Sequence, residues 1–301
     1  MLFSQFSESR VQRVNYKGKA FWVKRDDLIH PYFNGNKARK FKFYLESDTG
    51  RFQKVASYGG HQSNAMYSLA ALAKLKNLGF DYYAKPLPVT LRLNPVGNFK
   101  YAIEMGMNLI EIPDYEDFFQ RMSLPVKTYE SLGETTLLIR QGAAEKEAED
   151  GVKDLADEIK EFAQKEGIEM LKVFIQSGTG TTALFLQKHL DFEVITTPNI
   201  GGKDYLLKQF GLLESDTGHY PTILETEKKY VFGHLYRDYY EIWEAFSQET
   251  GILFELLYDP KTLIVLAEYM NESDVPIMYV HSGGVVGNES MLLRYKRFFN
   301  S

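Results

Sequence analysis

A lysine in a polar, glycine-containing segment is the first residue whose surroundings indicate chemistry. Lys37 follows an Asn-Gly-Asn sequence and stands where a helical pattern begins. The positive end of a helix favours loss of the amine's proton, and a neutral amine is a nucleophile. Lys37 is therefore a candidate for covalent catalysis. The alternative is an ordinary surface helix, because Arg39 and Lys40 make the same stretch basic.

A loop of small polar residues at positions 177–182 has the groups that bind a phosphate. Its sequence is Ser-Gly-Thr-Gly-Thr-Thr, between an apolar strand pattern and a helical pattern. Free backbone N–H groups, hydroxyls and the start of a helix all favour an anion. The loop matches neither the Walker A motif nor GxGxxG, which disfavours a nucleotide and leaves a compact phosphorylated cofactor. A plain polar turn is the alternative.

Two further loops carry polar side chains after apolar runs. His61, Gln62, Ser63 and Asn64 stand where one loop becomes a helix, so Ser63 and Asn64 can present side chains and N–H groups to a carboxylate. They can equally form an ordinary helix N-cap. The other loop is His-Ser-Gly-Gly at 281–284.

The elements that must position these loops share one arrangement. A short apolar run, a glycine loop and a helical pattern follow one another at 53–79, 171–190 and 275–292. This recurrence is typical of βα units on a mostly parallel sheet. We expect Gly79 to end the first of these helices. Residues 142–165 predict an acidic amphipathic helix with a solvated charged face, to which we assign no chemistry.

Composition limits the kind of protein this is. The chain has 301 residues, 44% hydrophobic and 25% charged, the balance of a globular protein long enough to enclose a cleft. Its 35 basic and 40 acidic side chains form no basic tract, so we expect no nucleic-acid partner. The absence of cysteine excludes thiolate nucleophiles and disulfides, and the six histidines lack the spacing of metal ligands.

No apolar run approaches the ~18 residues that a membrane span needs, so we expect no membrane association. The first residues also lack the apolar core of a signal peptide. We therefore expect a cytoplasmic enzyme.

Four ordered motifs, GNKARK, GGHQSN, SGTGTT and HSGG, together resemble the family of 1-aminocyclopropane-1-carboxylate deaminases and D-cysteine desulfhydrases. The resemblance runs from about Phe21 to Gly284 and includes GNFKYAIEMGMNLIEI at 97–112. That family belongs to the fold type II, tryptophan-synthase-β-like enzymes that use pyridoxal 5′-phosphate. The resemblance therefore implies this cofactor, a small amino-acid substrate and a homodimer.

The resemblance also implies the architecture. It predicts an α/β fold with two open, twisted, mostly parallel sheets flanked by helices, and a cofactor in the cleft between a large and a small domain. We place the large domain at residues 1–44 and 156–301 and the small domain at 45–155.

Family roles transfer to the matching positions. The resemblance makes Lys37 the Schiff-base lysine, Ser63 the serine that contacts the substrate carboxylate and takes part in catalysis, and Asn64 the residue beside the cofactor's 3-hydroxyl. Gln62 is expected at the substrate as well. The phosphate is expected in the loop formed by Ser177, Gly178, Thr179, Gly180, Thr181 and Thr182.

Two tyrosines are expected in catalysis. ETGILFELLYDPKT at 249–262 resembles the family stretch with a catalytic tyrosine before a short polar turn, which indicates Tyr258. A second tyrosine of the deaminases has no clean match in GHLYRDYYEIW at 233–243, where we favour Tyr236. Aromatic packing is the alternative for Tyr236.

Two residues compete for the nitrogen of the cofactor's ring. Asp259 is similar to an acidic residue of the deaminases, and Ser282 to a hydroxyl residue of the desulfhydrases. A carboxylate keeps the ring nitrogen protonated and deepens the electron sink, which a hydroxyl does not. Pro260 is expected to hold Asp259 in an extended backbone that turns its carboxylate away, which favours Ser282.

These residues predict an enzyme that converts a small amino acid to a 2-oxo acid and ammonia, similar to D-cysteine desulfhydrase. Ring opening of 1-aminocyclopropane-1-carboxylate is the alternative, and it would need Ser63 and Tyr258 because that substrate's Cα carries no hydrogen. A protein that binds a phosphate ligand without catalysis is the alternative from another class. Such a binder has no use for a nucleophilic Lys37.

Overall fold

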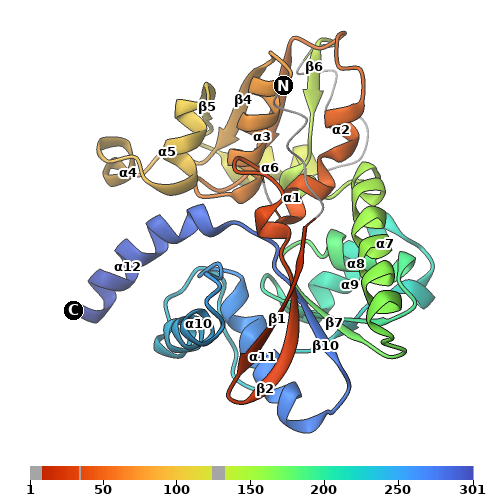
Figure 1. Cartoon of the computed structure of the whole chain (residues 1–301). Helices are drawn as coiled ribbons and strands as arrows, with labels where there is room; N and C mark the ends of the chain where they lie inside the picture. Colours follow the sequence, from red (N-terminus) through yellow and green to blue (C-terminus); the bar gives the residue numbers. More distant parts are fainter. Residues whose placement is uncertain (1–8, 34, 124–132, 301) are drawn as a thin grey trace.

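The computed structural model describes residues 9–33, 35–123 and 133–300, and it contains two sheets that lie one above the other in Figure 1. The larger sheet has six strands in the order β1-β2-β10-β7-β8-β9. Its strands are β1 (Val11–Tyr16), β2 (Lys19–Lys24), β7 (Lys172–Ser177), β8 (Glu193–Pro198), β9 (Thr222–Ile223) and β10 (Ile277–Val280). Only β1 runs antiparallel to its neighbour.

The smaller sheet is entirely parallel. Its order is β5-β4-β3-β6. Its strands are β3 (Lys54–Tyr58), β4 (Gly79–Ala84), β5 (Met107–Glu111) and β6 (Thr136–Leu138). The prediction of two mostly parallel sheets is therefore confirmed. The domain boundaries at 44/45 and 155/156 stay a prediction, and each falls within a helix of the structure.

Helices flank both sheets (Figure 1). They are α1 (Gly35–Lys40), α2 (Lys42–Glu46), α3 (Asn64–Leu75), α4 (Val89–Leu93), α5 (Gly97–Glu104), α6 (Tyr115–Ser123), α7 (Glu149–Glu166), α8 (Thr181–His189), α9 (Gly202–Leu213), α10 (Arg237–Thr250), α11 (Asp259–Glu272) and α12 (Asn288–Asn300). Within the described residues, no helix combines the length and apolarity needed to cross a bilayer.

Two helix boundaries differ from the prediction. Helix α3 ends at Leu75, before Gly79, because Asn77 adopts a left-handed backbone (φ 55°) and Gly79 already begins β4. The acidic helix begins at Glu149 rather than at residue 142. Residues 142–148 instead form tight turns, with Gly142 at φ 71°. These turns keep the segment close to the end of β6, and so near the loop after its neighbour β3.

The order of strands explains which loops meet. Strand β10 lies between β2 and β7, and the His281 N–H donates to the Lys24 carbonyl at 3.0 Å. The loop after β10 therefore lies beside the segment that leads from β2 to α1. In the smaller sheet β6 pairs with β3, so the segment after β6 lies beside the loop after β3. Parallel strands thus bring four loops to two facing sheet edges.

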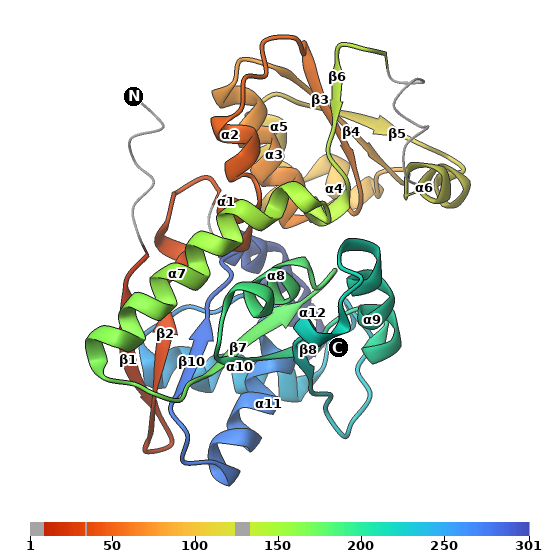
Figure 2. The ribbon, with the colours of Figure 1, turned by 90° about the vertical axis from the view of Figure 1, so that its right-hand side faces the viewer.

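The described chain passes between the sheets at two places. The first is the segment of α1 and α2, between β2 and β3, and the second is α7, between β6 and β7. Helix α7 lies alongside α1 in Figure 2. The two backbones meet at Gly151 of α7, where an added Cβ would lie 2.0 Å from the Arg39 carbonyl oxygen. Only glycine permits this approach.

Replacing this glycine tests the contact between α1 and α7. We expect Gly151→Ala to lower the free energy of unfolding by about 1–3 kcal/mol, because a backbone oxygen cannot rotate away from the new methyl group. Urea unfolding measures the change. Gly211→Ala in α9 is the matched control, since its Cβ would lie 3.5 Å from the Tyr220 Oη. The control should be neutral or stabilising by up to ~1 kcal/mol; equal losses in both variants would contradict the close contact.

Candidate active site

A cavity of about 560 Å³ lies where loops of the two sheets meet. Its walls include the loops after β3, β6, β7 and β10 and residues of α1 and α6. Lys85, Ile200, Tyr205, Phe232 and Tyr258 complete the lining. Most of the predicted site residues line it: Lys37, Ser63, Asn64, Ser177, Gly178, Thr179, Gly180, Thr181, Thr182, Tyr258 and Ser282. Residues from opposite ends of the sequence are therefore gathered at the carboxyl ends of parallel strands, where α/β folds bind ligands.

The short helix that carries Lys37 is held against the loop after β10. Gly35 has φ 59°, and an added Cβ would lie 1.7 Å from the Ser282 carbonyl oxygen. The Asn36 N–H donates to that same oxygen at 3.2 Å. The glycine of the GNK motif is thus needed for a close backbone contact. This contact brings Lys37 and Ser282 to one wall of the cavity.

Two lysine amines share one carbonyl oxygen in the cavity. The Nζ atoms of Lys37 and Lys40 lie 3.4 Å and 2.8 Å from the oxygen of Gly142. Loss of hydration lowers the pKa of Lys37 from its ordinary value of 10.5 to about 8. Burial, and then the charge of Lys37, lower the pKa of Lys40 well below 10.5. Burial, rather than the helix end expected from sequence, makes Lys37 a better nucleophile.

Sequence reasoning missed both Lys40 and Gly142. Lys40 stands three residues after Lys37 on one helix, a spacing that places both side chains on the same face. Gly142 lies in the segment to which the sequence analysis assigned no chemistry. Its position follows from the pairing of β6 with β3, which no local pattern reveals.

The loop after β7 has the properties of an anion site. Gly180 has φ 74°, and an added Cβ would lie 2.4 Å from Phe210 Cε1, so this turn requires glycine. Helix α8 begins directly after it. The Thr182 hydroxyl is buried and has no hydrogen-bond partner among the described residues. Backbone N–H groups at a helix start and an unused hydroxyl suit a phosphate.

The loop after β3 both caps helix α3 and lines the cavity. Ser63 is the N-cap of α3 and accepts the Met66 N–H at 3.4 Å, as the structural alternative predicted, yet it also lines the cavity. The Oδ1 atom of Asn64 accepts from Asn98 Nδ2 at 2.7 Å, which fixes the orientation of the Asn64 amide. Both residues can therefore present polar groups to a bound molecule.

Gln62 is not among the described residues that line the cavity. Its Nε2 donates to the Val96 carbonyl at 2.9 Å, and its Oε1 would lie 2.8 Å from a Cβ added at Gly97. The side chain is thus directed to the start of α5. The prediction of Gln62 at the substrate is not carried forward.

Tyr258 lines the cavity, with its ring against the phosphate-type loop. A Cβ added at Gly178 would lie 3.3 Å from Tyr258 Cε1. The phenol is buried, and burial together with the charge of Glu255 raises its pKa above the ordinary 10.0. Tyr258 therefore keeps its proton at neutral pH and can donate it in a hydrogen bond.

Tyr236 lies away from the cavity. Its hydroxyl accepts the Val231 N–H at 3.0 Å, and its ring packs against Tyr230 and Tyr239 with centroid distances of 4.9 and 5.3 Å. It is absent from the described residues that line the cavity. The aromatic alternative fits Tyr236, and a catalytic role is not carried forward.

Asp259 and Ser282 differ in what their side chains contact. Asp259 is fully buried, with Oδ1 accepting from the Tyr279 hydroxyl at 2.7 Å and Oδ2 from the Glu255 N–H at 2.8 Å. Asp259 is not among the described residues that line the cavity. Ser282 does, and its buried hydroxyl has no partner among the described residues. The two candidates for the ring nitrogen are therefore not equivalent.

The carboxylate of Asp259 is turned away for a reason other than the one expected. Asp259 is the first residue of α11 rather than extended chain, and Tyr258 before it is also α-helical in backbone. The expectation of an extended backbone before Pro260 is wrong. Instead, bonds to Tyr279 and to the Glu255 N–H hold the carboxylate inside the core.

Glu255 is a buried residue that sequence reasoning missed. Its Oε2 accepts the N–H groups of Leu257 and Tyr258 at 2.9 and 2.5 Å. Burial and the nearby charge of Asp259 raise the pKa of Glu255 from 4.5 to about 8. Its carboxyl group thus fixes the backbone that presents Tyr258.

In the described parts of the chain, no group of three or more His, Asp or Glu residues is arranged to bind a metal ion. The polar groups that line the cavity are mostly lysine amines, hydroxyls, side-chain amides and backbone N–H groups, with one histidine, His61, and one carboxylate, Glu116. This donor set suits a phosphorylated aldehyde more than a metal.

Comparisons with known proteins agree with the geometry. No family model matches the chain. A protein of Thermotoga maritima named putative 1-aminocyclopropane-1-carboxylate deaminase is 24% identical over 297 residues, which cover 92% of this chain and 93% of the relative. A second protein with the same name, from Pyrococcus furiosus, is 25% identical and covers 90% of this chain and 86% of its own length.

Solved structures share the fold. One described as an ACC deaminase homologue superposes with a TM-score of 0.77 at 19% identity, over 96% of this chain and 93% of the other. A hydrogen sulfide-producing enzyme of Fusobacterium nucleatum superposes with a TM-score of 0.68 at 14% identity, over 94% and 95%. The predictions of an enzyme and of pyridoxal phosphate agree with these proteins. The resemblance of this chain to the 1-aminocyclopropane-1-carboxylate deaminase and D-cysteine desulfhydrase family is thus confirmed.

Proposed function

We propose that the protein uses pyridoxal 5′-phosphate, attached to Lys37, to eliminate a leaving group from the β-carbon of a small D-amino acid such as D-cysteine. The products are a 2-oxo acid, ammonia and the leaving group. The observation that carries the choice of reaction is the unused hydroxyl of Ser282 in the cavity, whereas the carboxylate of Asp259 lies in the core and is already hydrogen-bonded. A homodimer and a cytoplasmic location stay predictions.

The described residues fit the proposed cofactor group by group. The loop at 178–182, with the buried Thr182 hydroxyl and the start of α8, suits the phosphate. Lys40 lines the same cavity, and a bound phosphate would favour its charged form. Lys37 supplies the amine for covalent attachment. Asn64 and Ser282 remain for the 3-hydroxyl and the ring nitrogen, in line with the roles that the resemblance implies.

The chemistry divides between the cofactor and the chain. Bound pyridoxal phosphate supplies an electron sink for negative charge at the substrate's Cα. The free amine of Lys37 would accept the substrate's Cα proton, for which a pKa near 8 is suitable. Ser63 binds the substrate carboxylate. The Cβ–S bond then breaks with its electron pair on sulfur, and water hydrolyses the released enamine to 2-oxo acid and ammonia.

The hydroxyl of Ser282 determines which reaction the site favours. A hydroxyl does not hold the ring nitrogen protonated, so the sink is weaker than one paired with a carboxylate. A weak sink suffices when the leaving group is as good as sulfide. The second candidate, ring opening of 1-aminocyclopropane-1-carboxylate, is favoured by the names of the sequence relatives. It would require Tyr258 and Ser63 to act on a substrate without a Cα hydrogen.

Attachment of the cofactor is the first test. Protein mixed with pyridoxal 5′-phosphate should develop a visible absorption band, and Lys37→Met should abolish it because Met has no amine. Lys42→Met, a change at a half-exposed ion pair outside the cavity, is the control and should keep the band. A full band in Lys37→Met would show that another amine, or none, holds the cofactor. A phosphate-binding protein without catalysis would show no covalent band in any variant.

The buried amine has a cost to folding that depends on pH. Lys37 has a folded pKa of about 8 and an ordinary value of 10.5, so folding opposes its charged form. The cost is at most about 3 kcal/mol, is fully present below pH 8, and disappears as pH rises toward 10.5. Without cofactor, Lys37→Met should therefore be more stable than wild type at pH 7, with the gap shrinking to about 1 kcal/mol at pH 10. Urea titrations at both values measure it; a gap independent of pH would contradict the lowered pKa.

Substrate preference separates the two candidate reactions. Sulfide release from D-cysteine should exceed 2-oxobutanoate formation from 1-aminocyclopropane-1-carboxylate. Ser282→Ala should reduce sulfide release by about tenfold or more, since one lost hydrogen bond to the cofactor costs roughly 1.5 kcal/mol or more. Asp259→Asn should lower stability yet keep most of the release in the folded fraction. Strong ring opening that collapses in Asp259→Asn would reverse the assignment in favour of the deaminase.

A further inference from the structure

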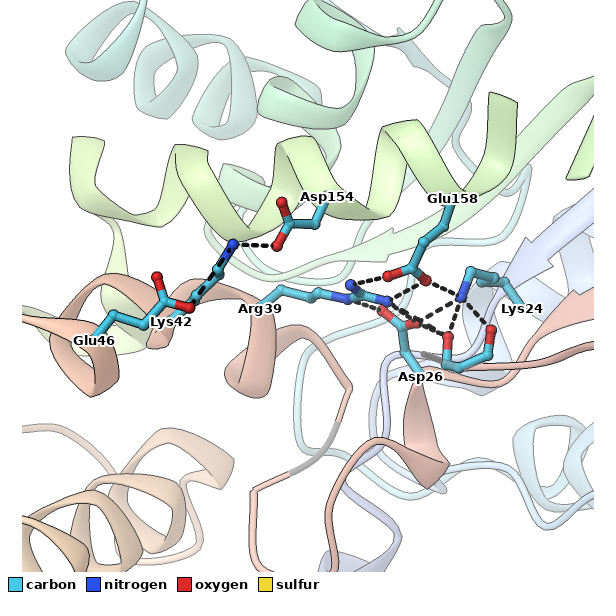
Figure 3. Close-up of polar contacts among 8 residues, drawn as sticks. Lys24, Asp26, Arg39, Lys42, Glu46, Asp154 and Glu158 are labelled. Carbon is cyan, nitrogen blue, oxygen red and sulfur yellow. Dashed lines mark hydrogen bonds and ion pairs between the residues drawn. The ribbon is translucent and has the colours of Figure 1, made fainter. Parts of the chain in front are cut away.

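Four charged side chains form a buried network behind the helix that carries Lys37 (Figure 3). They are Lys24 at the end of β2, Asp26 just after it, Arg39 on α1 and Glu158 on α7. Lys24 and Asp26 are each 1% exposed, Arg39 is 9% and Glu158 is 19% exposed. Two positive and two negative groups are therefore held together with little water.

Arg39 makes the contacts that join the network. Its Nε and Nη2 atoms donate to the two oxygens of Asp26 at 3.1 and 3.0 Å. Its Nη1 and Nη2 atoms donate to the two oxygens of Glu158 at 2.6 and 2.7 Å. Lys24 donates to Glu158 and to the Ser9 carbonyl, each at 2.5 Å. A planar guanidinium that bonds two carboxylates at once fixes orientation as well as distance.

The network lies at the place where both passages between the sheets meet. Arg39 belongs to the first passage and Glu158 to the second, while Asp26 comes just after β2 of the larger sheet. The Gly151 contact brings the α1 and α7 backbones together at Arg39 itself. The network thus fixes α1 relative to α7 and to β2 together.

Lys37 and Arg39 point in different directions from one short helix. Residues two apart in an α-helix are separated by about 200° around its axis. Lys37 accordingly lines the cavity, whereas Arg39 does not and reaches the network on the other side. A change at Arg39 therefore alters the position and orientation of α1 without removing any group from the cavity.

We propose that Arg39 is a positioning residue, which sets the place of the Lys37 amine in the cavity through its bonds to Asp26 and Glu158. The inference rests on the proposed attachment of pyridoxal phosphate to Lys37. Its contribution is geometric, because the network itself is electrically balanced and lies outside the cavity.

The rate of cofactor attachment tests the proposal without turnover. Cofactor-free protein is mixed with pyridoxal 5′-phosphate at one pH, and the visible band and its circular dichroism are followed. Arg39→Met should slow attachment by about tenfold or more, since a misplacement on the order of 1 Å costs about a hundredfold in oriented reactions. The dichroism of the band should weaken, because the attached ring is held less uniformly.

A neighbouring ion pair provides a matched control. Lys42 of α2 and Asp154 of α7 are 2.5 Å apart with side chains 34% and 43% exposed. Figure 3 shows Lys42 between Asp154 and Glu46, apart from the network of Arg39. Lys42→Met removes one positive charge that faces the same helix. Because exposed pairs contribute only about 0–1 kcal/mol, attachment should stay within about twofold of wild type.

Arg39→Lys keeps the proposal falsifiable if Arg39→Met does not fold. Lysine retains the charge but cannot bond both carboxylates in one plane, so we expect a folded protein with an intermediate attachment rate. Folded Arg39 variants with the wild-type rate and dichroism would show that the network only stabilises the fold, and would overturn the proposal. A wild-type protein that never attaches the cofactor would instead overturn the proposed function, and this inference with it.

Discussion

The site depends on the tertiary contacts of a helix of six residues, which is too short to be stable by itself. Isolated helices shorter than about 12–15 residues are marginal in water, so α1 (Gly35–Lys40) takes its position from tertiary contacts. The Asn36 N–H meets the Ser282 carbonyl at one end, and Lys40 meets the Gly142 carbonyl at the other. Arg39 bonds the buried carboxylates on the far side. Each contact involves a different part of the chain. The position of Lys37 therefore depends on how the loop after β10, the loop after β6 and helix α7 pack around α1.

The two amines on one carbonyl link the proposed phosphate site to the nucleophile. A single oxygen cannot stabilise two positive charges where water is scarce, and burial lowers the pKa of both lysines. A phosphate in the loop at 178–182 would favour the charged form of Lys40, which lines the same cavity. Among the described residues no anion faces Lys37 in the same way, so with the phosphate bound its amine would be the easier one to deprotonate. Binding of the phosphate and activation of the nucleophile are then assigned to separate lysines.

Sequence reasoning reached the parts of the site that depend on local backbone chemistry. Gly35 and Gly180 are required by positive φ and by close contacts, and both stand inside motifs that the sequence displays. Glycine loops after apolar runs also predicted the parallel sheets. Gly142, by contrast, stands after a strand of only three residues and before an acidic helix. Its approach to Lys37 comes from strand order, which pattern and propensity do not encode.

The same limit explains the tyrosines. Tyr258 stands in a stretch that resembles a family motif, whereas Tyr236 stands in a tyrosine-rich stretch without a clean match, and its local pattern does not show where its side chain lies. In the structure Tyr236 packs among other rings, while Tyr258 is presented to the cavity by a backbone that Glu255 holds. The charge network was hidden for a similar reason, since Lys24, Asp26, Arg39 and Glu158 look like ordinary surface charges until strands and helices bring them together.

Asp259 shows that the type of a residue does not decide its role. It follows Tyr258 directly, yet the first turn of α11 directs the two side chains to different surroundings. The Tyr258 ring faces the cavity, and the Asp259 carboxylate bonds to Tyr279 and to the Glu255 backbone in the core. Freeing it would leave a buried hydroxyl and a buried N–H without partners, each at a cost of about 1–3 kcal/mol. The carboxylate is thus retained by the fold, whereas the hydroxyl of Ser282 lines the cavity and has no hydrogen-bond partner among the described residues.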